Sequence, residues 1–438
     1  MKEPVQPLPP APPRFKPYPA YKDSGVEWLG EIPAHWRALA LKRIGDLQAG
    51  AGFPDDEQGN QDEEIPFFKV GDMGAPGNER EMLVHQHSVS RATARRLRAH
   101  IFPAGTIVFA KVGAALLLNR RRLVTRPSCI DNNMMGFIPD DCDTTWTLYW
   151  LTGLDMGRLA NPGAVPSVNE GQMRETPAAV PPIREQRAIA AFLDRETARI
   201  DALVAKKERL IALLQEQRTA LITRAVTNGL DPTDPMKDSG VEWLGEIPAH
   251  WGVKKLAWLT ECLDGQRVPL NAEERGRMQG NYPYWGANSI VDYVDRWLFD
   301  EELVLLGEDG APFFDRTRPV AFRVSGKVWV NNHAHVLRSS RSLDAAFLAA
   351  ALNCVDYRAF IDGTTRDKLT QGDMNSISIQ CPPTVEQRAI AAFLDRETAR
   401  IDALIAKVRE AIERLKELRT ALISAAVTGK IDVRAGAA

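Results

Sequence analysis

The amino-acid sequence contains two long blocks that each occur twice. Residues 22–36 recur letter for letter at 237–251, and residues 185–203 recur unchanged at 386–404. The segments that lie between the repeated blocks share little sequence and differ in length. A duplicated frame that carries two unlike inserts favours one scaffold that presents two different recognition surfaces.

The length and composition are those of a globular protein with several domains. The chain has 438 residues, of which 44% are apolar, so it fits about two to four domains of roughly 100 to 200 residues each. It has no run of about 18 apolar residues, and its first residues lack the basic-then-apolar order of a secretory signal. We therefore expect a cytoplasmic protein that has no membrane partner.

The cysteines and the charge narrow the classes of site. The five cysteines are scattered and form no C-x-x-C pair, which argues against both a zinc site and a disulfide framework. The formal net charge of -2 argues against a chain that coats nucleic acid everywhere. Basic residues nevertheless fill the segment 91–126, which has no Asp or Glu, and acidic residues crowd into 55–64.

Two segments, one after Pro181 and Pro182 and one after Pro382 and Pro383, predict long helices. Helix-forming residues dominate both, and no Gly or Pro interrupts them before Gly229 and Gly429. Apolar residues recur at spacings of three and four, which predicts a coiled-coil seam. An ordinary amphipathic surface helix is the alternative. The predicted seam residues are Leu193, Ile200, Leu203, Leu210, Leu214 and Leu221 in the first helix, and Leu394, Ile401, Leu404, Val408, Leu415, Leu418 and Leu422 in the second.

The two predicted helices are similar but not identical partners. Lys207 and Gln217 interrupt the first seam at positions where the second has Val408 and Leu418, so a pairing between the unlike copies is favoured. At about 1.5 Å per residue, each helix would be roughly 60 to 70 Å long, which is enough to separate two globular units. If the two ends of the chain lie together, the frame forms a ring of two similar halves with pseudo-two-fold symmetry.

The first insert predicts strands with basic residues at their ends. Strand-like segments at 65–73 and 105–113 run into glycine-containing turns, and three consecutive arginines follow. Arginine forks hydrogen-bond guanine edges or pair with phosphates, so an exposed run of them indicates DNA contact; a solvated basic face is the alternative. The candidate DNA-binding residues of this insert are Lys69, Lys111, Arg120, Arg121 and Arg122.

The second insert is richer in aromatic and amide side chains, notably within 282–288 and 328–337. Amides can hydrogen-bond adenine edges bidentately, and histidine can reach bases or phosphates. Two histidines that alternate along a strand also raise the possibility of a metal site, but no third ligand is evident, and we predict no metal. The candidate DNA-binding residues here are Trp285, Asn288, Arg316, Arg318, Asn331, Asn332, His333 and His335.

The sequence has none of the common catalytic signatures. It lacks a phosphate-binding P-loop, an H-E-x-x-H motif, a G-x-S-x-G elbow and a G-x-G-x-x-G turn. It also lacks the Asn/Asp-Pro-Pro-aromatic tetrapeptide of amino-methyltransferases. We therefore predict a binding protein; a stand-alone nuclease or methyltransferase, and a duplicated protein-protein adaptor without a role on DNA, are the alternatives.

The repeated motifs resemble those of the specificity (S) subunits of type I restriction-modification systems. The resemblance rests on the Glu-Trp-Leu-Gly-Glu-Ile-Pro segment 27–33 with His35 and Trp36, on the Pro-Pro helix starts at 181–187 and 382–388, and on the segment 331–335. It covers nearly everything from Lys22 to Asp432. Long identical blocks that frame unrelated inserts are not expected of a generic coiled-coil protein.

The resemblance implies an α+β fold in which two target recognition domains are separated by an antiparallel pair of long helices. The corresponding segments are a Pro-rich disordered tail (1–21), the first recognition domain (22–182), a central helix (183–229), the second recognition domain (230–381) and a C-terminal helix (382–431). Each domain would recognise one half of a split sequence in double-stranded DNA, and the helices would set the spacing.

The resemblance also implies partners that carry the chemistry. Two modification subunits would supply S-adenosylmethionine and adenine methylation, and restriction subunits would supply ATP- and Mg-dependent translocation and cleavage. The chain itself would bind no cofactor and would not be an enzyme. The assembled complex would be a site-specific endonuclease and an adenine-N6 DNA methyltransferase.

Overall fold

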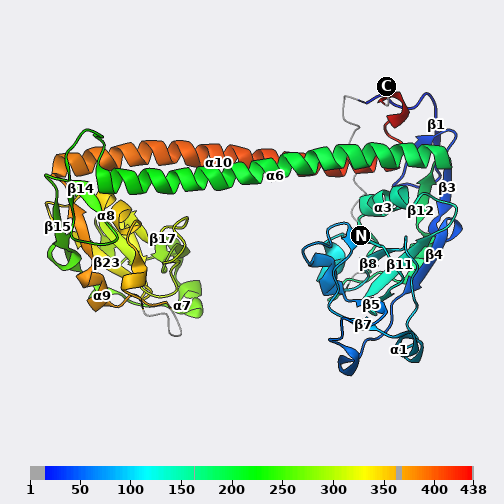
Figure 1. Ribbon diagram of the computed structural model, residues 1–438, viewed down its shortest axis with the longest axis horizontal. Helices are drawn as coiled ribbons and strands as arrows, with labels where there is room; N and C mark the ends of the chain where they lie inside the picture. Colours follow the sequence, from blue (N-terminus) through cyan, green and yellow to red (C-terminus); the bar gives the residue numbers. More distant parts are fainter. Residues whose placement is uncertain (1–14, 162, 362–366, 437–438) are drawn as a thin grey trace. The chain divides into compact units, whose positions relative to one another are not determined.

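The computed structural model describes residues 15–161, 163–361 and 367–436, which form two compact units. The first unit runs to Ala205 and is completed by the segment from Ala411, whereas the second runs from Lys206 to Glu410. Each unit joins a globular part of helices and strands to one half of each long helix (Figure 1). These units differ from the predicted segments, which set the two helices apart from the recognition domains.

Among the described residues, the globular part of the first unit contains twelve strands and five short α-helices. Its strands are β1 (Tyr21–Asp23), β2 (Glu31–Pro33), β3 (Arg37–Ala40), β4 (Gly45–Ala49), β5 (Ile65–Phe68), β6 (Glu81–Met82), β7 (Ser88–Val89), β8 (Ile107–Ala110), β9 (Arg121–Val124), β10 (Cys129–Ile130), β11 (Met134–Pro139) and β12 (Pro177–Val180). Its helices are α1 (Arg91–Arg96), α2 (Ala114–Leu117), α3 (Thr144–Gly153), α4 (Met156–Leu159) and α5 (Glu170–Glu175).

The globular part of the second unit is built in the same way. Its strands are β13 (Met236–Asp238), β14 (Glu246–Pro248), β15 (Gly252–Lys255), β16 (Thr260–Cys262), β17 (Gln279–Trp285), β18 (Ile290–Val294), β19 (Phe299–Asp300), β20 (Leu303–Gly307), β21 (Ala321–Val324), β22 (Lys327–Val330), β23 (Ala334–Ser339) and β24 (Ser378–Cys381). Its helices are α7 (Ala272–Arg277), α8 (Ala345–Leu352) and α9 (Gln371–Ser376).

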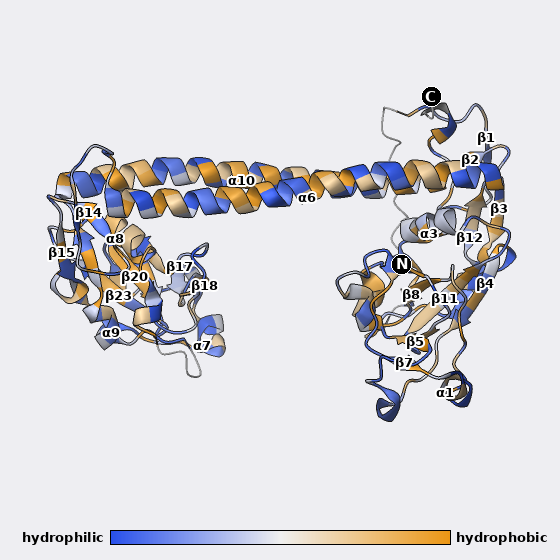
Figure 2. Ribbon diagram, viewed as in Figure 1, coloured by the Kyte–Doolittle hydropathy of each residue, from blue (hydrophilic) through white to orange (hydrophobic). Residues whose placement is uncertain are grey.

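The two inserts share a sheet plan that their sequences do not reveal. The central sheet has the order β4-β11-β8-β9-β6 in the first unit and β16-β23-β20-β21 in the second. A second sheet accompanies each, with the orders β10-β5-β7 and β18-β17-β22-β19. In both of these sheets, the strand that comes just before β11 or β23 in the chain pairs in parallel with an earlier strand, β10 with β5 and β22 with β17. The inner strands β8 and β20 are buried along their whole length and are apolar, as expected of strands that are covered on both faces (Figure 2).

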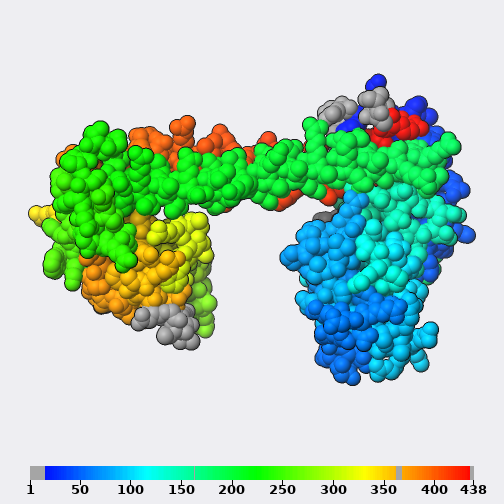
Figure 3. All heavy atoms as spheres, in the orientation of Figure 1, coloured from blue at the N-terminus to red at the C-terminus, as the bar shows by residue number. Residues whose placement is uncertain are grey.

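The long helices are α6 (Ile183–Asn228) and α10 (Thr384–Val427), in agreement with the predicted ranges. Gly229, with φ of +74°, follows the last residue of α6, a backbone conformation that glycine adopts at low cost. In Figure 3, the green atoms of α6 lie directly against the cyan atoms of the first globular part. In that contact Phe192 and Leu193 share one apolar core with Trp146 and Tyr149 of α3.

Ion pairs show that the two long helices run antiparallel within each unit. Asp201 accepts from Nε of Arg419 at 3.0 Å in the first unit, and Asp402 accepts from Nε of Arg218 at 3.1 Å in the second. Asp201 and Asp402 are matching residues of the repeated block, so the two pairs are reciprocal. The pairing of unlike copies that the sequence predicted is confirmed.

The predicted seam is partly wrong. Leu203, Leu210, Leu404 and Leu418 are 40–44% exposed, so they do not lie in the interface between the helices. The rows that face the partner helix are shifted by one residue at these places, which was possible because Val204 and Ile405 are also apolar. The buried and half-buried positions that recur at spacings of three and four are Leu193, Thr197, Ile200, Val204, Lys207, Ile211, Leu214, Arg218 and Leu221 in α6, and Leu394, Thr398, Ile401, Ile405, Val408, Ile412, Leu415, Arg419 and Leu422 in α10.

The predicted disordered tail is also partly wrong. Residues 1–14 lie outside the described residues, but residues 15–21 are folded, and Tyr18 is only 3% exposed. The N–H of Asp432 donates to the carbonyl of Lys16 at 2.8 Å, and Nζ of Lys430 donates to the carbonyl of Glu31 at 2.7 Å. The beginning and the end of the described chain therefore meet in the first unit, which is the condition that the ring arrangement required.

The repeated frame places a His–Glu pair in each unit, but only one pair is embedded. Nε2 of His35 lies 2.8 Å from Glu185, and Nε2 of His250 lies 2.9 Å from Glu386. Glu185 also accepts hydrogen bonds from the Tyr18 hydroxyl and from the indole N–H of Trp36. Burial, and secondarily the bond to Glu185, raises the pKa of the Tyr18 hydroxyl far above its usual value.

Candidate nucleic-acid interface

A tight turn joins β10 to β11 in the first unit. The N–H of Asn133 donates to Oδ1 of Asp131 at 2.9 Å, and the N–H of Asp131 donates to the carbonyl of Phe68, the last residue of β5, at 2.9 Å. The side chains of Asn132 and Asn133 are exposed. The turn thus presents two amides beside the ends of two parallel strands. Sequence analysis missed both, although adjacent asparagines directly before a strand are a usable signal.

The second unit has a turn of the same construction between β22 and β23. The N–H of His333 donates to Oδ1 of Asn331 at 2.8 Å, and the N–H of Asn331 donates to the carbonyl of Trp285, the last residue of β17, at 3.0 Å. Asn332 is exposed, and the His333 side chain is 42% exposed. We term residues 131–133 and 331–333 the strand-end turns.

Different side chains flank the two strand-end turns. In the first unit, the N–H of Lys111 donates to the carbonyl of Asn133 at 2.8 Å, and Lys69 lies one residue before Val70, whose N–H donates to Asp131. The structure thereby brings together Lys69 and Lys111, which the sequence had predicted separately. In the second unit, Glu308 takes the place of Lys111, because its N–H donates to the carbonyl of His333 at 2.8 Å.

Two other predicted residues of the second unit lie near its turn. Asn288 is half-buried in the connection between β17 and β18. The ring of Trp285 packs 5.5 Å from that of Phe322, and its buried indole nitrogen has no hydrogen-bond partner among the described residues. Trp285 therefore contributes packing beneath the turn, while Asn288, Asn331, Asn332 and His333 remain predicted contacts.

The prediction for His335 is wrong. Its side chain is 1% exposed, with Nδ1 at 2.6 Å from Asp264 and Nε2 at 2.9 Å from the carbonyl of Leu369. Both ring nitrogens are occupied by these partners, so none is available to DNA. Burial raises the pKa of Asp264, but hydrogen bonds from His335 and from the N–H of Val336 outweigh it, and the net pKa is lowered.

A charge network surrounds His335 rather than a free set of metal ligands. Ligand atoms of Asp264, Glu308 and His335 lie within 4.8 Å of one another. Nη1 of Arg267 lies 2.6 Å from Glu308 and Nη2 lies 3.3 Å from Asp264, while Nζ of Lys368 lies 3.3 Å from Glu308. Arg267 and Lys368 already balance the negative charges of the two carboxylates, so the electrostatic attraction for an additional cation is weak.

The three consecutive arginines of the first insert have three different environments. Arg121 is 5% exposed, and its guanidinium donates to the carbonyls of Leu151 and Leu154 at 3.0 and 2.9 Å. Burial lowers the pKa of Arg121 to about 9, which still leaves it protonated at neutral pH. The DNA-contact prediction is therefore wrong for Arg121. Arg122 is half-buried and donates to the carbonyl of Met73 at 2.9 Å, and Arg120 is exposed.

Arg316 and Arg318 are exposed in the connection between β20 and β21. The structure does not bring them to the strand-end turn. They line a cavity between α8 and the halves of α6 and α10 that belong to the second unit. Nη2 of Arg316 lies 3.9 Å from Asp356, which is a weak, exposed ion pair.

The type I restriction modification DNA specificity domain matches residues 33–212 and again 248–414, which together make up more than half of the chain. The chain belongs to this family. Each match of this specificity domain family includes one globular part, one strand-end turn and most of one long helix.

Curated relatives agree with this assignment. A putative type I restriction enzyme specificity subunit of Haemophilus influenzae is 34% identical over 164 residues, or 37% of this chain and 39% of the relative. The type I restriction enzyme EcoDI specificity subunit of Escherichia coli is 25% identical over 43% of this chain and 40% of the relative. The chain therefore aligns with about two fifths of the length of these two relatives.

Solved structures show the same fold at low sequence identity. A chain from a structure on complex assembly and conformational transition of the type I R-M system is 18% identical, with a TM-score of 0.64, over 90% of this chain and 98% of that chain. The HsdS subunit from Thermoanaerobacter tengcongensis is 16% identical, with a TM-score of 0.51, over 91% and 98%. Within the described part of this specificity-domain chain, none of the helices is both long and apolar enough for a bilayer crossing.

Proposed function

We propose that this chain is the specificity subunit of a type I restriction-modification complex and that each unit recognises one half of a bipartite DNA sequence. The observation that carries the proposal is the pair of strand-end turns, which share an Asx hydrogen bond and a backbone hydrogen bond to the neighbouring strand but present different side chains. A shared backbone with exchanged side chains is what two recognition surfaces of one scaffold require. The double match of the specificity domain and the relatives' names support it.

The strand-end turns have the chemistry for direct contact with base edges. Exposed amides can hydrogen-bond adenine bidentately in the major groove, and lysines contact guanine or phosphates. Because the turn backbone is fixed by an Asx hydrogen bond, Asn132 and Asn332 would lose little conformational freedom on binding. Lys69 and Lys111 give the first turn positive neighbours, whereas Glu308 lies next to the second. The two units would therefore prefer different half-sites.

The proposal assigns the catalytic steps to other subunits. Two modification subunits would bind S-adenosylmethionine and methylate adenine, and restriction subunits would bind ATP and Mg for translocation and cleavage. Leu203 and Leu418 in the first unit, and Leu210 and Leu404 in the second, are exposed apolar side chains that subunit docking would cover. The complex would act on double-stranded DNA in the cytoplasm.

The test is to co-express the chain with the modification subunit of its own system in a host without DNA methylation, and to map methyladenine across the genome. We expect a split motif that is methylated on both strands. Asn132→Ala should relax the motif in one half, and Asn332→Ala should relax it in the other. Gln217→Ala, at an exposed position of α6, is the matched control and should leave the motif intact.

Two results would contradict the proposal. A stable complex of the expected subunits that methylates no sequence would show that the chain is an adaptor without DNA recognition. Methylation at a motif that neither asparagine substitution relaxes would keep the specificity role but would remove the strand-end turns from it.

A further inference from the structure

The two units have hollows at matching places; the first is lined by Tyr149, Asp194 and Thr197, and the second has Ala350 in place of the tyrosine. The helices α3 and α8 occupy matching places, because the N–H groups of their capping residues, Asp143 and Asp344, both donate to a glutamine of the repeated block at 2.8 Å. Counting along the two helices from these caps pairs Tyr149 with Ala350. Tyr149 is 5% exposed, so its replacement by alanine removes a whole buried ring.

In the first unit, the ring of Tyr149 is held by polar contacts at its hydroxyl. That hydroxyl lies 2.8 Å from Oδ1 of Asp194, to which it donates, and 3.0 Å from the hydroxyl of Thr197. The guanidinium of Arg80 lies 5.5 Å from the centre of the ring and pairs with Asp194 at 2.7 Å. The site therefore binds a phenol through one charged acceptor, one hydroxyl and one cation over the ring face.

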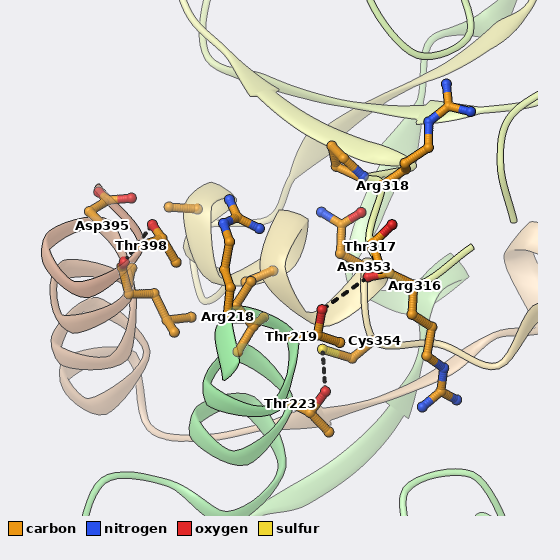
Figure 4. Close-up of a pocket in the computed structure, with 16 residues that line it drawn as sticks. Arg218, Thr219, Thr223, Arg316, Thr317, Arg318, Asn353, Cys354, Asp395 and Thr398 are labelled. Carbon is orange, nitrogen blue, oxygen red and sulfur yellow. Dashed lines mark hydrogen bonds between the residues drawn. The ribbon is translucent and has the colours of Figure 1, made fainter. Parts of the chain in front are cut away.

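In the second unit, the acceptors are present and the ring is absent. Asp395 and Thr398 are the residues of the second repeated block that match Asp194 and Thr197. Both line a cavity of about 160 Å³ (Figure 4), and Ala350 also belongs to its lining. Asp395 is exposed and makes no hydrogen bond or ion pair within the described part of the chain. Its charge acts on Arg323 only through a longer-range electrostatic attraction.

The size and lining of the cavity suit one aromatic ring. Its floor is apolar: Ala391 and Leu394 are buried, and Ala350 and Ile222 are half-buried. An apolar cavity of about 150 Å³ is large enough to bind benzene. Most of the other polar groups are already engaged: Asn353 makes four hydrogen bonds, and Arg218 pairs with Asp402.

We propose that this cavity is a binding site for a phenol group, whose ring lies on the apolar floor and whose hydroxyl donates to Asp395. The phenol belongs either to a small molecule or to a tyrosine side chain of a bound polypeptide. The basis is that matching acceptors in the first unit already hold a phenol, so the geometry of recognition is built into the repeated block.

The test is titration of the full-length chain with p-cresol, the isolated tyrosine side chain, followed by calorimetry. We expect saturable binding at one site. Ala350→Tyr, which restores the ring, should abolish that binding. Asp395→Ala should weaken p-cresol about tenfold, since a hydrogen bond to a charged acceptor is lost, and should leave the affinity for toluene unchanged. Tyr149→Ala should create a second p-cresol site in the first unit.

The results distinguish a free phenol from a tyrosine side chain as the ligand, and they show whether the proposal fails. If N-acetyl-L-tyrosinamide binds as well as p-cresol, the cavity admits a ring that is attached to a polypeptide; if only p-cresol binds, the ligand is a free phenol. Absence of saturable p-cresol binding to the unmodified chain would overturn the proposal. So would equal affinity for the unmodified chain and for an Ala350→Tyr variant that melts cooperatively. The Asp395→Ala comparison with toluene decides the case if Ala350→Tyr fails to fold.

Discussion

The two units of this chain have one backbone plan and two sets of side chains. Four central strands follow the same order in both, and both strand-end turns make the same two backbone hydrogen bonds. At matching places, however, the first unit has Met135 where the second has His335, and Tyr149 where the second has Ala350. The difference shows that the sheet and helix frame fixes positions in space, whereas the inserts are free to exchange the groups at those positions.

The two units are most alike in the long helices, where the buried and half-buried rows of α6 and α10 correspond residue for residue. Ile405 is 7% exposed, whereas its neighbour Leu404 is 44% exposed. We expect Ile405→Asp to lower the free energy of unfolding of the second unit by more than about 4 kcal/mol, because a carboxylate would be buried without a partner. Leu404→Asp, the matched control, should change it by less than about 0.5 kcal/mol. Urea titration of the two variants measures both.

Equal losses for Leu404→Asp and Ile405→Asp would show that the interface rows are misassigned. Val204→Asp extends the test to the first unit. Val204 is half-buried and matches Ile405, so the loss should be smaller but in the same direction.

The repeated glutamates provide a second test of how context changes a shared residue. The Glu185 side chain is 6% exposed and accepts hydrogen bonds from Tyr18, His35 and Trp36. The Glu386 side chain is 23% exposed and pairs with His250. We expect Glu185→Ala to cost about 3 kcal/mol, since buried donors lose a charged acceptor, and Glu386→Ala to cost about 1 kcal/mol or less. Hydrogen exchange of peptides from each unit would report the two losses separately.

If both glutamate variants lose the same stability, the additional donors around Glu185 contribute nothing measurable. Glu185→Gln is the finer control. It keeps the size and an acceptor oxygen, so it should lose less than Glu185→Ala.

The sequence predicted the long helices of the repeated frame better than it predicted the candidate nucleic-acid interface. The helix ranges followed from the run of helix-forming residues between each Pro-Pro pair and the next glycine, and the antiparallel pairing was implied by the resemblance to the specificity subunits. The seam was displaced at Leu203 and Leu404 because an apolar residue follows each of them, so both alternatives satisfied the heptad pattern. Only the packing in three dimensions distinguishes them.

The candidate nucleic-acid interface was predicted less well, because the exposure of its side chains depends on residues that are far away in the sequence. Arg121 is buried by carbonyls of Leu151 and Leu154, which lie some way along the chain at the end of α3. No local pattern distinguishes it from the exposed Arg120. The match between the two strand-end turns was likewise hidden, because it consists of backbone hydrogen bonds and a single shared asparagine.

The arginine run offers a third and smaller test, because the matching segment of the second unit is apolar. Arg120→Ala should weaken DNA binding by up to about tenfold and should lower the slope of log affinity against log salt by about one, as expected for one lost phosphate contact. Its thermal stability should not change. Arg121→Ala should instead lower the stability. If Arg120→Ala binds DNA normally at moderate salt, Arg120 is not a contact.

The smallest expected effect is a difference in acid sensitivity between the two units. The folded pKa of Asp264 is lowered, so the stability that it contributes is complete above its unfolded pKa of about 4 and is lost as the pH falls through the folded value. The first unit has Met135 in place of His335 and lacks this carboxylate–histidine contact. We therefore expect protection against hydrogen exchange to decrease below about pH 4 more in peptides of the second unit than in those of the first.

The Asp264→Asn variant should remove much of this difference between the units. Its contact with His335 is already weakened at neutral pH, and the asparagine has no carboxylate that acid could protonate. An equal acid response of both units in the unmodified chain would mean that the network around His335 adds nothing to the stability of the second unit.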